Sequence, residues 1–173
     1  MTTIRIVVTG HPVGKGRART VRLPNGVSHS YTPAKTKRWE QDAREQARAA
    51  MGKRPPVSGP VILSMAVGFV VPQSWPAWKR EAALAAHVCH TTRPDLDNVV
   101  KAVKDAFNGV VWLDDCQVDQ IHATKLYAAI PAVHAWVTFM PFGAGEQNIG
   151  IRVGAQITKR SDLKEIAHDP RNL

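Results

Sequence analysis

A run of apolar and small residues at positions 61–71 constrains the fold more than any other part of this sequence. Val61 and Leu63 start one alternating face, and Ile62 and Ala66 lie on the other. Successive side chains of a strand point to opposite faces of the sheet, so a strand that is apolar on both faces is covered on both. The segment therefore predicts a strand in the interior of a sheet.

The other apolar patterns predict three more strands and three helices around this segment. Period-two alternation marks the strands, and apolar residues at helical spacing mark the helices. With 173 residues, the chain has the length of one compact domain. The expected strands span residues 4–9, 117–127 and 132–140, the helices span 33–51 (with Thr32 as N-cap), 74–87 and 95–108, and a loop rich in glycine and arginine spans 10–26.

The net charge is strongly positive, at +9, with 23 Lys and Arg against 14 Asp and Glu. Such an excess is typical of proteins that bind nucleic acids, although a solvated basic surface without a partner gives the same composition. No apolar run approaches the roughly 18 residues of a membrane span, and the N-terminus is too short and too alternating for a signal peptide. Cys89 and Cys116 are typical of reduced thiols. We therefore expect a cytoplasmic protein with no membrane partner.

Two pairs of carboxylates stand out against this basic background. Asp95 and Asp97 lie at the expected start of the third helix, and Asp114 and Asp115 follow a short apolar run after it. Carboxylates repel phosphate, so their clustering in a basic protein suggests that a hard divalent cation lies between protein and substrate. Mg²⁺ is the expected cofactor, with Mn²⁺ as a substitute. Lys101 follows Asp97 by one helical turn, where an ammonium can stabilise a leaving oxygen, so the pattern predicts a metal-dependent nuclease.

Helix capping offers a second explanation for part of this pattern. A carboxylate at Asp95 or Asp97 is favoured by the exposed N–H groups of a helix start and by the helix dipole. A cap needs one carboxylate, whereas this turn carries two and another pair follows it. If capping explained the acids, the chain would be a basic DNA-binding module without catalytic activity.

Basic residues gather in three places that we expect to contact DNA phosphates. Arginine side chains pair with phosphate oxygens, and glycines in the expected loop are taken to keep it mobile and let its backbone approach DNA. A solvated loop without a partner is the alternative. The candidates are Lys15, Arg17, Arg19 and Arg22 in the loop, Lys35, Lys37 and Arg38 at the start of the first helix, and Arg93 beside the acidic motif.

The sequence around these residues resembles the RusA family of Holliday-junction resolvases, endonucleases that act as dimers on four-way DNA. The resemblance covers most of residues 4–140. It is most specific over residues 93–109 (RPDLDNVVKAVKDAFNG) and 111–118 (VWLDDCQV), and shorter similar stretches lie at 14–19, 31–36 and 72–75.

For the site, this resemblance implies that Asp95, Asp97 and Asp115 are metal-binding acids and that Lys101 is a functional lysine. Asp114 is adjacent to a matched position and is a further candidate as a ligand or as a neighbour of the ligands.

For the whole chain, the resemblance implies an α/β (α+β-like) fold in which a mixed β-sheet is packed with helices. We expect this single domain over residues 1–142, with residues 143–173 as a C-terminal extension beyond the resemblance. The implied function is Mg²⁺-dependent resolution of Holliday junctions by paired symmetric nicks, carried out by a homodimer encoded by a bacterium or a phage. A nuclease for other branched DNA, such as flaps and forks, is the alternative within the enzymes.

Overall fold

The computed structural model describes residues 1–22 and 26–139. The expected C-terminal extension, residues 143–173, lies outside these described residues. No helix in the described part of the chain is long and apolar enough to cross a membrane.

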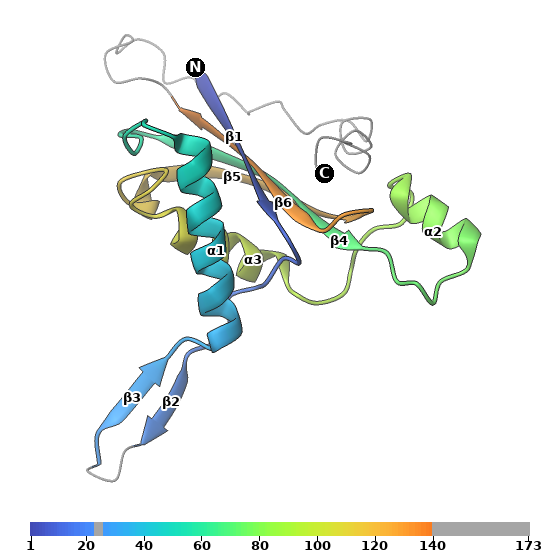
Figure 1. The fold of residues 1–173 in the computed structure, drawn as a ribbon, viewed down its shortest axis with the longest axis horizontal. Coiled ribbons are helices and arrows are strands. Elements are labelled where there is room, and N and C mark those ends of the chain that lie inside the picture. Colours follow the sequence, from blue (N-terminus) through green and yellow to red (C-terminus); the bar gives the residue numbers. More distant parts are fainter. Residues whose placement is uncertain (23–25, 140–173) are drawn as a thin grey trace.

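A four-stranded mixed sheet forms the centre of the fold (Figure 1). Its strand order is β1-β6-β4-β5, with β4 parallel to β5 and antiparallel to β6, and β1 antiparallel to β6. The apolar run that begins at Val61 is β4, and its place between β6 and β5 confirms the predicted interior strand. The strands are β1 (Thr2–Thr9), β4 (Val61–Val70), β5 (Val118–Ala128) and β6 (Ala132–Phe139).

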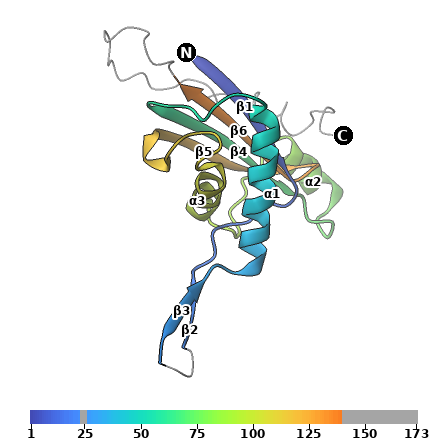
Figure 2. The same ribbon diagram turned by 60° about the vertical axis from the view of Figure 1, so that its left-hand side comes forward.

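Two helices, α1 (Ala34–Met51) and α3 (Leu96–Phe107), pack on the same face of this sheet (Figure 2). Each buries a stripe at helical spacing: Trp39 and Ala43 from α1, and Val99 and Val103 from α3, join one core with the inward side chains of β1, β4 and β6. A third helix, α2 (Ala77–Leu84), packs its buried Ala83 near Tyr127 of β5. The predicted mixed α+β fold is therefore confirmed.

Element ends differ slightly from the predictions. Helix α1 begins at Ala34, and Pro33 occupies the cap position that we had expected for Thr32. Helix α3 begins at Leu96, with Asp95 at its N-cap. The ends of α1 and α3 differ by one or two residues, as helix assignments usually do, whereas α2 covers only Ala77–Leu84 of the expected 74–87.

The expected 10–26 loop is wrong in its second half. Residues Arg19–Arg22 (β2) and Ser28–Tyr31 (β3) form an antiparallel hairpin, with Arg19 opposite Tyr31 at its base. The hairpin extends away from the sheet and helices, beyond the N-terminal end of α1 (Figures 1 and 2). Its described residues in β3 are all exposed, so no apolar alternation marks these strands in the sequence.

Candidate active site

Asp97 and Asp115 line one hollow of about 640 Å³ between α3 and the inward face of β5. Asp97 lies in the first turn of α3, and Asp115 begins a single 3-10 turn, η1 (Asp115–Gln117), just before β5. The predicted nearness of the two acidic pairs therefore holds for one member of each. The remaining lining residues are Leu96, Val100, Lys101, Lys104, Asp105, Ile121 and Ala123.

The buried segment before η1 explains why Asp115 reaches this place. Trp112 is fully buried in the core and bridges to Val57. The Gln117 side-chain amide then donates to the backbone carbonyls of Val57 and Gly59, at 3.0 and 2.8 Å. Core packing on one side and two hydrogen bonds on the other thus hold η1 beside α3.

Two lysines accompany the carboxylates in this hollow. Lys101 and Lys104 follow Asp97 by one and two helical turns, on the side of α3 opposite to its buried stripe. The Lys104 ammonium lies 3.5 Å from a carboxylate oxygen of Asp115, in a partly exposed pair that is worth little to stability. The pair instead places the positive charge of Lys104 beside the acids of the hollow.

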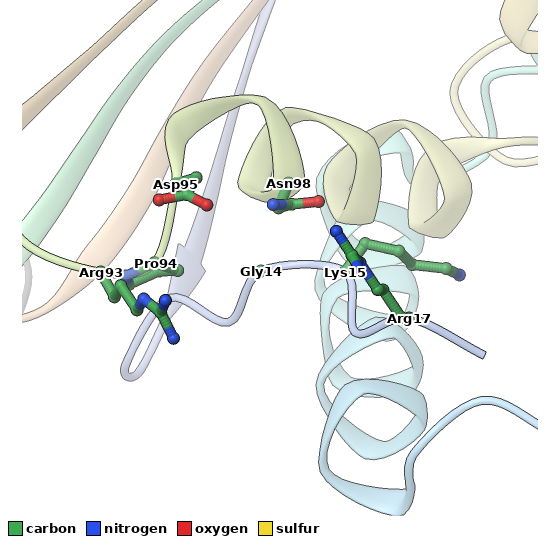
Figure 3. A pocket seen from close by; sticks show the side chains of 7 residues that line it. All are labelled: Gly14, Lys15, Arg17, Arg93, Pro94, Asp95 and Asn98. Carbon is green, nitrogen blue, oxygen red and sulfur yellow. The ribbon is translucent and has the colours of Figure 1, made fainter. Parts of the chain in front are cut away.

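Asp95 lies in a different, neighbouring hollow of about 650 Å³ (Figure 3). Arg17 and Arg93 line it too, and the loop through Gly14 passes along α3 beside Asn98. Asp95 occupies the N-cap position of α3, but its side chain makes no capping hydrogen bond. Capping therefore does not account for this carboxylate.

Asp114, by contrast, has a structural partner. Its carboxylate accepts a hydrogen bond from the Cys116 backbone N–H at 2.9 Å, and its own N–H donates to the Gln117 side chain at 2.9 Å. The two bonds form a capping box for η1, and the bond from Cys116 lowers the pKa of Asp114. Asp114 orders the turn that presents Asp115.

The donor set of the first hollow fits Mg²⁺. This ion is usually held by one or two carboxylates, with water and substrate phosphate completing its octahedron, and Asp97 and Asp115 supply two from separate elements. Over residues 1–22 and 26–139, no three His, Cys, Asp or Glu side chains are grouped closely enough to hold a metal among themselves. The structure therefore brings Asp97, Asp115 and Lys101 together and leaves Asp95 next to them.

Lys15 makes ion pairs within the protein. Its ammonium lies 2.6 Å from a carboxylate oxygen of Glu40 on α1 and 2.6 Å from one of Asp105 on α3. Burial alone lowers the pKa of Lys15, but the hydrogen bonds to Asp105 and Glu40 outweigh it and hold the pKa above its ordinary value of 10.5. The lysine joins its loop to both helices, and its charge is already balanced.

The glycines beside Lys15 lie in a loop that packs closely against two helices, a role that differs from the expected approach of the backbone to DNA. A Cβ on Gly14 would lie 3.1 Å from the Cβ atoms of Pro94 and Asn98, and one on Gly16 would lie 3.0 Å from Pro33. The Lys15 backbone N–H also donates to the Asn98 carbonyl at 2.8 Å. The glycines allow the loop to approach α1 and α3 closely.

Six of the other expected DNA contacts lie on the surface. Arg17, Arg93, Lys35, Lys37 and Arg38 are exposed, as is Arg22 on β2, and Arg19 begins that strand. Sequence reasoning missed Lys104 and Asp105, although their helical spacing from Asp97 was a usable signal. It also missed Lys125 on β5, whose ammonium donates to the backbone carbonyls of Thr92 and Pro94. Only the tertiary fold brings that lysine to this loop.

Comparison with known proteins agrees with this arrangement. The family model described as endodeoxyribonuclease RusA matches residues 9–138. A relative from Bacillus subtilis (strain 168), named "Uncharacterized protein YqaN", is 36% identical over 141 residues, which cover 79% of this chain and 96% of that protein. The family match covers β2 to β5, most of β6, the three helices and the residues that line both hollows, and it leaves out nearly all of β1, so the chain belongs to the RusA family of endodeoxyribonucleases.

Proposed function

We propose that this protein is a Mg²⁺-dependent, structure-selective endonuclease that resolves Holliday junctions by paired symmetric nicks. Membership of the RusA family gives the nuclease class and the branched DNA substrate. The observation that carries the metal dependence is the shared hollow of Asp97 and Asp115, with Lys101 and Lys104 beside them. Mn²⁺ is expected to replace Mg²⁺ because both ions prefer oxygen ligands.

In this proposal Asp97 and Asp115 would hold the cation, with water and substrate phosphate as its other ligands. Asp95, the third predicted ligand, would have to move in from the adjacent hollow when the cation binds. Bound Mg²⁺ supplies charge neutralisation of the scissile phosphate and activation of water. Attack by the water oxygen on phosphorus breaks the bond to the 3′-oxygen and leaves a 5′-phosphate and a 3′-hydroxyl. The Lys101 ammonium, one turn along α3 from Asp97, stabilises the negative charge that develops on the phosphate or the leaving oxygen.

The basic residues around the site are proposed to hold DNA. Arg17 and Arg93 line the hollow of Asp95, where they offset its negative charge toward phosphate. Lys35, Lys37, Arg38, Arg19 and Arg22 extend this basic region from α1 to the hairpin. We assign Lys15 a structural role, since two carboxylates already surround its ammonium.

A homodimer completes the proposal, because a two-fold pair of sites matches the near two-fold symmetry of a four-way junction. Two equivalent sites would nick opposed strands. Sedimentation of the protein alone and with a junction tests this stoichiometry, and a monomer acting alone on the junction would contradict it.

The deciding experiment uses a labelled four-way junction, a flap, a fork and a linear duplex, each with Mg²⁺ or with EDTA. We expect paired nicks in the junction only, lost in EDTA and reduced by roughly 100-fold or more in Asp97→Asn. Glu81→Gln removes one carboxylate from the exposed surface of α2 and serves as the matched control. Junction binding without cleavage in Mg²⁺ or Mn²⁺ would refute catalysis, and faster cleavage of flaps or forks would reassign the substrate.

A further inference from the structure

The hairpin of β2 and β3, which we call the β2–β3 arm, is separate from the main sheet. Its two strands pair with each other and with no strand of the four-stranded sheet. Both views show it projecting beyond the end of α1 (Figures 1 and 2). A lone two-stranded hairpin is marginally stable in water, so a projecting one stabilises the domain little and is more suited to contact a partner.

The charge of this region indicates which partner it is. From Gly16 to Trp39 the sequence contains six Lys or Arg and no Asp or Glu, although the chain as a whole has 14 acids. Arg22 and His29 are exposed on the arm, together with Tyr31, of which 41% is exposed. A surface with one sign of charge and an exposed aromatic ring fits a polyanion.

The arm is continuous with the candidate site. Arg17 lines the hollow of Asp95, and the chain then runs directly into β2 at Arg19 (Figure 3 shows the loop at this point). DNA that contacts Arg17 and Arg93 at the site therefore has a basic track beside it along the arm. The chain therefore connects the hollow of Asp95 directly to the β2–β3 arm, which offers a second surface for DNA contact.

We infer that the β2–β3 arm lies in a groove of the duplex that flanks the cleavage point. The major groove of B-DNA accepts a two-stranded β-ribbon, and the four residues of each strand extend about 13 Å. At about 3.4 Å per base pair, this length covers roughly four base pairs. The inference rests on the proposed function for the position of the cut, but the duplex contact itself does not require cleavage.

A second copy of this chain is the competing partner. An exchanged arm would bring the acid-free stretch of one copy against the other, and two copies of this stretch repel where they face each other. Charge thus favours DNA, and not a second copy of this chain, as the partner of the arm. The oligomeric state of an armless variant distinguishes the two partners.

The test removes the arm from the full-length protein. Because Arg19 and Tyr31 are paired at the base, replacing residues 20–30 with Asn-Gly closes the two strands with a tight turn. The control is Lys53→Ala with Arg54→Ala, which removes two exposed charges just past the opposite end of α1. Arg22→Gln tests the same contact if the armless protein does not fold.

The measurement is binding to a linear duplex and to junctions with arms of 5 or 20 base pairs, over a range of salt, without a divalent metal. We expect the salt slope of the armless variant to fall by about 0.9 for each lost phosphate contact, and Arg22→Gln to lose one such contact. Wild type should bind the long junction more tightly than the short one, whereas the armless variant should lose this preference. The control should behave as wild type.

Unchanged duplex affinity and slope in the armless variant and in Arg22→Gln would overturn the inference. Conversion to a monomer without a change in slope would also overturn it and would assign the arm to the second copy. A wild-type protein that never cleaves junctions, but whose duplex binding depends on the arm, would refute the proposed function and support the arm contact. The experiment therefore distinguishes failure of the arm contact from failure of the proposed function.

Discussion

Lys125 and Pro94 are joined by a 2.9 Å hydrogen bond, in which the Lys125 ammonium donates to the Pro94 backbone carbonyl. The same ammonium donates to the Thr92 carbonyl at 2.6 Å. Both carbonyls lie in the segment that enters α3 at Asp95, so a side chain of β5 fixes the start of the helix that carries the acids. Lys125 is thus a positioning residue for the site.

We predict that Lys125→Met lowers junction cleavage and raises the Mg²⁺ concentration for half-maximal rate, because the acids lose their fixed placement. The loss of two bonds from a charged donor should also lower the free energy of unfolding by about 1–3 kcal/mol. Lys125→Arg keeps a donor and should recover part of both effects. Lys53→Met, at an exposed turn, is the control; equal effects in all three variants would show that Lys125 has no special role.

Asp114 and Asp115 are neighbours with different expected roles. Asp115→Asn should abolish Mg²⁺-dependent cleavage and leave the melting temperature almost unchanged, because its carboxylate faces the hollow. Asp114→Ala should instead lower the melting temperature, because η1 loses its capping box, and should reduce cleavage only in part. Thermal melts and cleavage rates of the two variants test this division, and equal loss of cleavage in both would contradict it.

The capping of η1 also predicts a pH dependence. Since the pKa of Asp114 is lower in the folded protein than its usual 3.8, its contribution is complete above that value and is lost as pH falls through the folded-state pKa. Melting of wild type and Asp114→Ala over acidic pH should therefore converge as the carboxyl is protonated. A constant difference across this range would show that Asp114 does not titrate with folding.

The ion pairs of Lys15 predict a loss of stability at high pH. Its pKa is raised on folding, so the pairing contributes fully below pH 10.5 and is lost as pH rises through the folded-state value. Lys15→Met should destabilise the protein by about 1–3 kcal/mol at neutral pH and remove this part of the alkaline decline. A double-mutant cycle with Asp105→Asn should give a coupling of about 0.5–3 kcal/mol. Unchanged stability with a lower salt slope of DNA binding would instead make Lys15 a phosphate contact.

The sequence predicted the elements whose side chains divide between core and solvent. Strand β4 and helices α1 and α3 each have a complete apolar face, and periodicity reads such a face directly. It could not predict the β2–β3 arm, since neither of its strands packs on the core and their described side chains are exposed. Because these strands do not pack on the core, their sequence has no alternation of apolar and polar residues from which strands could be predicted.

The individual roles of the acids were harder to predict than their presence. Asp95 looked like a cap and makes no capping bond, whereas Asp114 looked like a metal candidate and caps η1. The distinction depends on which backbone N–H groups lie within reach, and this is set by the fold. For the same reason, the pairing of Lys15 with Glu40 and Asp105, which come from two different helices, left no local signal in the sequence.

Gly14 and Gly16 offer a test of how closely the loop must approach the two helices. An added Cβ at Gly14 meets Pro94 and Asn98, at the start of α3, whereas one at Gly16 meets Pro33 and Thr36, at the start of α1. Both alanine variants should be destabilised, by about 1–3 kcal/mol for overpacking less about 0.4–1 kcal/mol gained from a stiffer unfolded chain.

Only Gly14→Ala should also slow junction cleavage beyond its effect on stability, because it displaces the turn that carries Asp95 and Asp97. Gly16→Ala displaces the start of α1 and serves as the matched control. Cleavage rates measured well below both melting temperatures separate the two effects. If the two variants lose cleavage equally, the position of the α3 start does not limit the reaction, and the loop matters through stability alone.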